Sequence, residues 1–277
     1  FYVGYSYKYN CPSRYIDIIH GLSKEHNIGI KLANNVGESE GLLFSSEKTG
    51  IDLVKRAKNT KKIISTYQTD FVESYSLYAG IADHILMPSR FIADYYNLHT
   101  DKNLYLGIPK YDIGLDQESI LKKYSIPEGK KALIIWPKGR DEGQTDMDSI
   151  LSTLKQQGFT LLVKTRGKDP LISEAKQTLK KSGDFYFEDT SWYPHTTQEL
   201  LEISDIAINF GSTTIEECVM HNVPVINFDV KPEVRNGSKR PYRVTHDYLY
   251  NYNYCVQGLK DFSESQASSF KPQGITI

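Results

Sequence analysis

The feature that most constrains the fold is an alternation of short apolar strands with amphipathic helices along most of the chain. The alternation begins with a strand at residues 1–5 and a helix at 15–26, and it restarts with a helix at 117–124 and a strand at 131–136. Strands that alternate with helices of about 10 to 15 residues predict βαβ units and a parallel sheet. A continuous apolar strand such as 131–136 fits a sheet that is covered on both faces.

The restart of the pattern near residues 108–116 predicts a division of the chain. We expect two facing, doubly wound, Rossmann-like α/β domains, one at 1–112 and one at 113–260, followed by a tail at 261–277. Ligands of such sheets bind outside the carboxyl ends of the strands. The cleft between the two domains is therefore the expected site.

Composition and charge narrow the class of protein. The 277 residues are 39% hydrophobic and 24% charged, which is typical of a globular protein. The formal net charge of −1 disfavours nucleic acid as a partner, because a surface that neutralises phosphates needs a basic excess. The sequence shows no apolar run of the roughly 20 residues that cross a bilayer and no signal-peptide pattern at its start. Three cysteines without CxxC spacing disfavour a disulfide framework or a zinc site, and they favour a cytoplasmic location.

The strongest local signal lies directly after the apolar strand at 206–210. Small and hydroxyl-bearing residues follow that strand and open a helix: Gly211, Ser212, Thr213 and Thr214. Their backbone N–H groups and hydroxyls, together with the positive end of the helix, can cradle a diphosphate. Glu216 or Glu217, in the first helical turn, could then reach a ribose or sugar hydroxyl. The alternative is an ordinary capping box, in which one of these glutamates pairs with Ser212 or Thr213.

This segment also carries a family resemblance. The run G-S-T-T-I-E-E-C-V-M-H-N-V-P-V-I-N-F resembles the donor-binding segment of GT-B glycosyltransferases. Within that superfamily it is most similar to CDP-glycerol glycerophosphotransferases, capsule-type glycosyltransferases and UDP-N-acetylglucosamine 2-epimerases. The resemblance extends over residues 131–229 and is weak over 1–110. It implies a two-domain GT-B fold in which Gly211, Ser212, Thr213 and Thr214 bind the donor diphosphate and Glu216 or Glu217 binds the ribose.

Two further loops are expected to bring cations to the same site. Lys138 and Arg140 follow the strand at 131–136, and Lys164 and Arg166 lie at the end of the strand at 159–164 and just after it. Arginine offers a bidentate clamp and lysine a point charge, and both can offset the charge on a leaving nucleotide. Glycerophosphotransferase-like proteins have His-Pro after the lysine, where this chain has Thr165-Arg166, so the subfamily stays open. The alternative is a solvated cluster of charges.

The remaining candidates concern the nucleobase and the catalytic base. Trp192, in the loop after the strand at 185–187, can stack on a nucleobase, although plain packing explains an aromatic residue equally well. An inverting transfer needs a base that takes the proton of the acceptor hydroxyl, and Asp70 and Glu73 are the candidates. Asp70 can also serve only as the N-cap of the helix that follows.

These features predict a metal-independent glycosyltransferase of polysaccharide biosynthesis. It would move a sugar, or a glycerol-phosphate-like group, from a nucleotide-activated donor to a glycan or lipid-linked acceptor. No cofactor is expected besides the donor, and no metal, because Asp146-Met147-Asp148 has the spacing of a metal motif but opens a helix. A UDP-sugar 2-epimerase is an alternative, disfavoured because its donor loop usually contains Ser-Gly-Gly. A non-catalytic nucleotide-sugar or glycan-binding module is the other alternative.

A basic loop raises the question of a membrane partner. Its cations are Arg235, Lys239, Arg240 and Arg243. Such a loop could touch substrate phosphate or an anionic membrane surface, and it could equally be a solvent-exposed connection. A peripheral contact at the inner face of the membrane is the corresponding expectation. The sequence does not predict the oligomeric state.

Overall fold

The computed structural model divides the chain into two compact units. Unit 1 comprises Phe1–Ile113 together with Ile277, and unit 2 comprises Gly114–Thr276. The residues whose structure is described are 2–4, 24–25, 27, 31–33, 41–46, 51–58, 60–65, 75–87, 89–105, 114–137, 146–166, 171–181, 184–189, 196–210, 212, 214–228, 234–235, 238–239 and 253–256. Each unit is described by itself.

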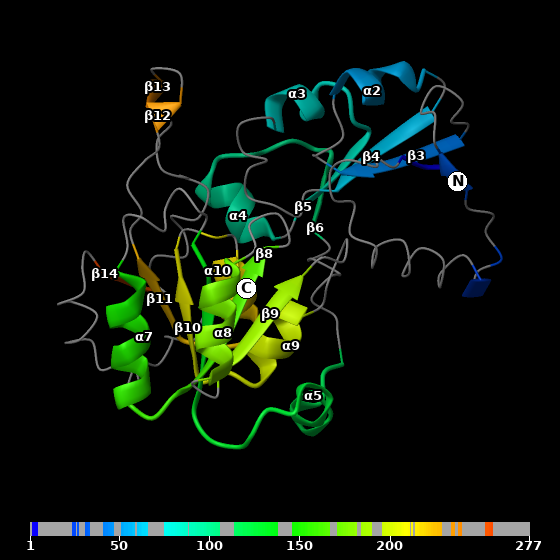
Figure 1. The fold of residues 1–277 in the computed structure, drawn as a ribbon. Helices are drawn as coiled ribbons and strands as arrows, with labels where there is room; N and C mark the ends of the chain where they lie inside the picture. The colour runs from blue at the N-terminus through cyan, green and yellow to red at the C-terminus, as the bar shows by residue number, and fades with distance from the viewer. Residues whose placement is uncertain are drawn as a thin grey trace. The chain divides into compact units, whose positions relative to one another are not determined.

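Unit 1 is built on a parallel sheet with helical crossovers (Figure 1). Its strands are β1 (Tyr2–Gly4), β2 (Lys31–Ala33), β3 (Gly41–Ser46), β4 (Thr60–Ser65), β5 (His84–Met87) and β6 (Asn103–Tyr105). They lie in the order β2-β1-β3-β4-β5-β6, and every pair is parallel. The order reverses between β1 and β3, so the unit is doubly wound. Its helices include α2 (Ile51–Arg56), α3 (Tyr75–Ala79) and α4 (Arg90–Tyr95).

The sequence pattern does not predict strand β3, because it indicates a strand at 27–34 and next a helix at 49–58. In the structure β3 pairs with both β1 and β4 and is therefore a central strand. Its apolar run is only Leu42-Leu43-Phe44, between a glycine and two serines. A run that short lacks the length by which strands are normally recognised, although Leu43 is fully buried.

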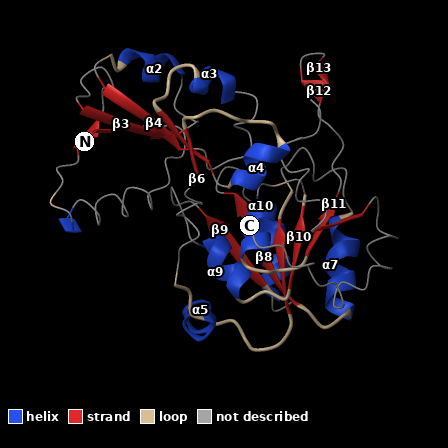
Figure 2. Ribbon diagram, turned by 180° about the vertical axis from the view of Figure 1, so that it is seen from behind, coloured by secondary structure: helices blue, strands red, loops and turns tan. Residues whose placement is uncertain are grey.

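Unit 2 has the strand order of a Rossmann fold. Its sheet contains β7 (Lys131–Ile135), β8 (Thr160–Arg166), β9 (Phe185–Asp189), β10 (Ile206–Asn209), β11 (Val225–Phe228) and β14 (Asn253–Val256). These strands are all parallel and lie in the order β14-β11-β10-β7-β8-β9. Figure 2 shows strands β8, β9, β10 and β11 in one sheet. The order reverses between β7 and β10, and this reversal is the topological switch point where such sheets bind ligands.

The helices of unit 2 follow the predicted places closely. They are α5 (Gln117–Tyr124), α7 (Met147–Gln156), α8 (Ser173–Lys181), α9 (Thr196–Glu202) and α10 (Thr214–Met220). Helix α7 begins after Asp146, whose carboxylate accepts the backbone N–H of Ser149 at 3.1 Å. The chain leaves α7 at Gly158, where a φ of +82° favours glycine.

Side chains from both faces of this sheet are buried. Met147, Ile150 and Leu154 of α7 belong to one core cluster with alternate strand residues, among them Ile134, Val163 and Ile208. The intervening residues, such as fully buried Leu133 and Leu162, point to the opposite face because successive strand side chains alternate.

A side-chain hydrogen bond also joins the starts of two neighbouring strands. The carboxylate of Asp205 accepts the backbone N–H of Lys131 at 2.7 Å, which joins the start of β10 to the start of β7.

Three features of unit 2 differ from the expectations. Strand β8 continues to Arg166, so Arg166 belongs to the strand, as Lys164 does, and not to the loop after it. Strand β14 was not predicted, and it adds a further parallel strand beside β11. The basic segment predicted as a loop contains a hairpin of β12 (Val234–Arg235) and β13 (Ser238–Lys239). The intervening Asn236-Gly237 is a strong hairpin signal in sequence.

Candidate functional site

The candidate site lies at the switch point of unit 2. Strands β7 and β10 are paired there, and the chain leaves both at the same edge of the sheet because they are parallel. The connection after β10 begins the predicted diphosphate loop, and the connection after β7 leads to Lys138 and Arg140. The register pairs Ile208 with Ile134 near the strand ends, so these two connections, which are distant in sequence, start from neighbouring strands.

The connection from β10 to α10 is held by a buried amide. Asn209, the last residue of β10, is 0% exposed, and its Nδ2 donates to the carbonyl oxygen of Ser212 at 3.1 Å. The same carbonyl accepts the backbone N–H of Ile215 at 3.3 Å. The Ser212 hydroxyl lies 3.1 Å from the Thr214 hydroxyl and accepts the Thr214 N–H at 3.4 Å. Ser212 and Thr214, both predicted site residues, are therefore brought together.

Asn209 is a residue that the sequence analysis did not select. Its signal was present, because it is the one amide in the otherwise apolar strand Ile206-Ala207-Ile208-Asn209. A polar side chain at such a position needs a hydrogen-bond partner, since leaving it unsatisfied costs about 1–3 kcal/mol. In the structure that partner is the loop that was predicted to bind the ligand, so Asn209 shapes the candidate site.

The two glutamates of α10 differ in exposure. Glu216 is only 8% exposed, whereas Glu217 is half-buried. Burial, with the Glu217 carboxylate as a secondary cause, raises the pKa of the fully buried Cys218 thiol far above its usual range. Cys218 therefore stays a protonated core residue and is no nucleophile. Whether Glu216 or Glu217 meets a ribose stays a prediction.

Strand β8 pairs with β7 on the flank opposite to β10. The backbone N–H of Trp136, just past β7, donates to the carbonyl of Lys164 at 2.9 Å and prolongs the pairing of the two strands. Lys164 is half-buried, and the next residue, Thr165, is 2% exposed. The indole Nε1 of Trp136 is buried without an acceptor among the residues that the structure describes.

Several predicted site residues lie outside the described residues. These are the proposed bases Asp70 and Glu73, the cations Lys138 and Arg140, the aromatic Trp192, and Gly211 and Thr213 of the diphosphate loop. For Arg166 the structure describes the backbone, which pairs in register with Asp189 of β9. The roles of all these residues stay predictions.

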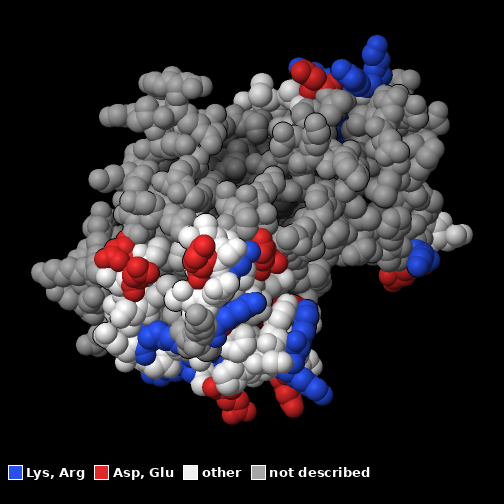
Figure 3. Space-filling model, in the orientation of Figure 1, with Lys and Arg blue, Asp and Glu red and all other residues white. Residues whose placement is uncertain are grey.

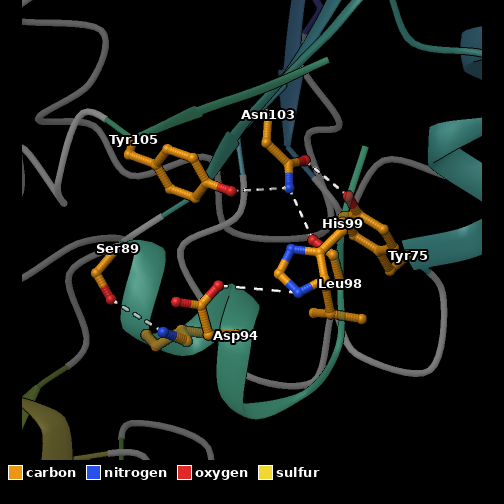
Figure 4. A network of polar contacts seen from close by, with 8 residues as sticks. Tyr75, Ser89, Asp94, Leu98, His99, Asn103 and Tyr105 are labelled. Carbon is orange, nitrogen blue, oxygen red and sulfur yellow. Dashed lines mark hydrogen bonds and ion pairs between the residues drawn. The ribbon is translucent and has the colours of Figure 1, made fainter. Parts of the chain in front are cut away.

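Unit 1 contributes a polar network near α3, α4 and β6 (Figure 4). The Tyr75 hydroxyl donates to Asn103 Oδ1 at 2.7 Å, and Asn103 Nδ2 donates to the Leu98 carbonyl at 2.7 Å. Burial raises the pKa of Tyr75, so the phenol remains a neutral donor. The network joins α3, the turn after α4 and β6. Asn103 therefore has a structural role.

The described surface carries charges of both signs. Figure 3 shows acidic and basic side chains interspersed over unit 2 on the face in view. Within the described ranges, the structure holds no group of three or more His, Cys, Asp or Glu residues placed to bind a metal ion. In the same ranges, no helix is long and apolar enough to span a membrane.

Comparison with known proteins identifies the fold. No family model and no curated protein sequence matches the chain. Among solved structures it is similar to the wall teichoic acid polymerase TagF, with a TM-score of 0.63 and 14% identity over 95% of this chain and 78% of that chain. A TagF structure soaked with CDPG gives a TM-score of 0.64 and 14% identity over 95% of this chain and 78% of that one. A third TagF structure gives a TM-score of 0.62 and 15% identity over 96% of this chain and 81% of that chain.

At this level of identity the likeness shows the fold alone. It confirms the predicted α/β fold with doubly wound parallel sheets, and this fold is similar to that of TagF. That the two Rossmann-like parts face each other across a cleft stays a prediction.

Proposed function

We propose that the chain is a glycosyltransferase that takes a group from a nucleotide-activated donor held at the switch point of unit 2. The observation that carries the proposal is the strand order. It sets the connection after β10, with Ser212 and Thr214, beside the connection after β7. Both were selected from the sequence as diphosphate-binding segments, and a switch point is where doubly wound sheets bind nucleotides. The GT-B fold shared with TagF supports the same reading.

In this function the diphosphate lies against the β10–α10 connection. The Ser212 and Thr214 hydroxyls and nearby backbone N–H groups donate to its oxygens, and Asn209 holds the connection in shape. Lys164 and Arg166 from β8, with Lys138 and Arg140 after β7, offset the charge that develops on the leaving nucleotide. These cations make a metal unnecessary. Trp192 stacks on the nucleobase.

The acceptor reacts through a hydroxyl group. Asp70 or Glu73 removes its proton as the oxygen attacks the donor, and the nucleoside diphosphate or monophosphate leaves. The proposed acceptor is a glycan or a lipid-linked saccharide. A glycerol-phosphate-like group is the alternative cargo, supported by the likeness to a polymerase whose structure was determined with CDPG.

The test is thermal stabilisation by UDP, CDP, GDP, ADP and CDP-glycerol, each with and without magnesium. A ligand that binds only the folded state stabilises it by RT ln(1 + [L]/Kd), about 2.7 kcal/mol at a hundredfold excess over Kd. One nucleotide is expected to raise the unfolding temperature without magnesium. Lys164→Ala is expected to abolish most of this shift, and Lys180→Ala, on the exposed side of α8, serves as the matched control. If no nucleotide stabilises the protein, the transferase proposal fails.

A further inference from the structure

Tyr186 connects the two ends of the segment that joins β8 to α8. Its hydroxyl oxygen lies 3.1 Å from Thr165 Oγ1 and accepts the backbone N–H of Leu171 at 3.4 Å. Thr165 lies at the end of β8, and Leu171 lies just before α8. One hydroxyl group thus contacts the chain both before and after the connection at 167–170.

The ring of Tyr186 is held in place by its own surroundings. It packs against the core cluster of unit 2, on the face that contains Val163. The Lys176 Nζ lies over the ring, 5.2 Å from its centroid, and the same nitrogen binds Glu188 Oε2 at 2.8 Å. Tyr186 and Glu188 are alternate residues of β9 and share one face of the strand. The hydroxyl therefore has a fixed position relative to the sheet.

Its partners are equally constrained. Thr165 is 2% exposed and Leu171 is 6% exposed, so bulk water cannot replace these contacts without an opening of the structure. The register sets Val163 opposite Tyr186 and Thr165 opposite Glu188, so the Thr165–Tyr186 contact is a diagonal one between neighbouring strands. Both contacts join residues that are distant in sequence, because Tyr186 is 21 residues from Thr165 and 15 residues from Leu171.

We propose that Tyr186 is a positioning residue for the donor site. Its hydroxyl fixes the separation of the two ends of the β8–α8 connection, and thereby holds Lys164 and Arg166 where the donor diphosphate is bound. The inference rests on the proposed function and deepens it by assigning a residue that does not itself touch the donor. The physical basis is preorganisation, since cations that are already in place lose less freedom when an anion binds.

The test is the Tyr186→Phe variant, which removes the hydroxyl and keeps the ring. The first measurement is amide hydrogen exchange at Leu171 in the protein without ligand, and the expected result is faster exchange. The second is the Kd of the nucleotide that stabilises the wild-type protein. We expect this Kd to rise about three- to tenfold, which corresponds to the loss of one ordinary hydrogen bond.

Variants of the partner and of a second tyrosine provide the controls. Thr165→Val removes the partner hydroxyl and should raise the Kd by a similar factor, whereas Thr165→Ser keeps the hydroxyl and should restore affinity close to wild type. The double variant of Tyr186→Phe and Thr165→Val should be no weaker than the worse single variant, since both remove the same contact. Tyr75→Phe removes another buried tyrosine hydroxyl, in unit 1, and should lower stability without changing the Kd.

The outcomes separate this inference from the proposed function. If the wild-type protein binds none of the nucleotides, the proposed function fails, and the inference fails with it before any variant is compared. If the wild type binds but Tyr186→Phe has an unchanged Kd, the inference alone is overturned, even where Leu171 exchanges faster, because the contact is then only structural.

Discussion

Asn209 shows how a single buried amide can hold the connection that is the candidate binding loop. Its side chain donates to the Ser212 carbonyl, which also accepts the N–H of Ile215 at the start of α10. A carbonyl that accepts two donors is fixed in direction, and the hydroxyls of Ser212 and Thr214 are fixed with it. The residue lies at the end of β10, at the switch point where doubly wound sheets bind ligands.

Replacing Asn209 by alanine should therefore affect stability and ligand binding together. We expect Asn209→Ala to lower the free energy of unfolding by about 1–3 kcal/mol, because a buried hydrogen bond is lost. Denaturant unfolding measures this change. Nucleotide affinity, measured by calorimetry, should fall as well. Asn103→Ala in unit 1 removes a comparable hydrogen-bonded amide and should lower stability alone; an equal loss of affinity in both variants would contradict the assigned role of Asn209.

Sequence analysis could identify some residues of the candidate site but not others. Ser212, Thr214 and Lys164 could be selected because their residue types suit an anion and they follow recognisable strands. Tyr186 could not be selected, because its hydroxyl meets Thr165 and Leu171 only after β8 and β9 have paired. A sequence pattern indicates local periodicity, whereas a side-chain contact between neighbouring strands depends on the register in which the strands pair.

At the scale of elements, the most regular segments were predicted best. Helix α5 has the predicted bounds, which its N-cap Asp116 marks, and α10 begins at Thr214 as predicted. Strands β3 and β14 were missed. Leu42-Leu43-Phe44 is too short to stand out, and Asn253–Val256 is a segment of only four residues in a tyrosine-rich stretch. Pairing with an existing sheet edge, more than intrinsic pattern, makes such segments strands.

The N-cap of α7 leads to a prediction about pH. Hydrogen bonds from the Ser149 hydroxyl and backbone N–H lower the pKa of Asp146 below its ordinary value of 3.8. A group with a depressed pKa in the folded state contributes stability above its unfolded pKa, and this contribution is lost as the pH falls through the folded pKa. Thermal unfolding should therefore show the wild type losing stability relative to Asp146→Asn below about pH 4.

The Asp146→Asn variant is informative because asparagine is also a good N-cap but does not titrate. At neutral pH the wild type and Asp146→Asn should have nearly the same thermal stability. Asp148→Asn removes the same formal charge from the same turn and controls for net charge. A difference between wild type and Asp146→Asn that is constant from pH 7 to pH 3 would show that the carboxylate contributes nothing specific.

At the scale of the whole molecule, the division into two units separates two predicted tasks. Unit 2 contains the switch point with Ser212 and Thr214, and unit 1 contains the predicted bases Asp70 and Glu73. Each unit has its own parallel sheet, and unit 2 has its own buried core cluster. Binding of the donor and removal of the acceptor proton are thus expected to depend on different parts of the chain.

A fragment of unit 2 tests this separation. The fragment Gly114–Thr276 should bind the donor nucleotide with a Kd close to that of the full chain and should catalyse no transfer. Calorimetry measures the first property, and release of the nucleotide from the donor measures the second. In the full chain, Asp70→Asn with Glu73→Gln should reproduce this behaviour, with a rate lowered by about 10²- to 10⁴-fold and unchanged donor affinity. Loss of donor binding in the folded fragment would mean that unit 1 supplies part of the donor site.

The strand order of unit 2 also has a consequence for its synthesis on the ribosome. Strands β7, β8 and β9 leave the ribosome first and can pair with one another, whereas the partner on the other side of β7 is made only when residues 206–209 emerge. Until then one flank of β7 lacks the neighbour that it has in the finished sheet. The proposed donor site, at the ends of β7 and β10, is therefore expected to be among the later parts of unit 2 to form, and a chaperone that shields apolar strands would be most useful during that interval.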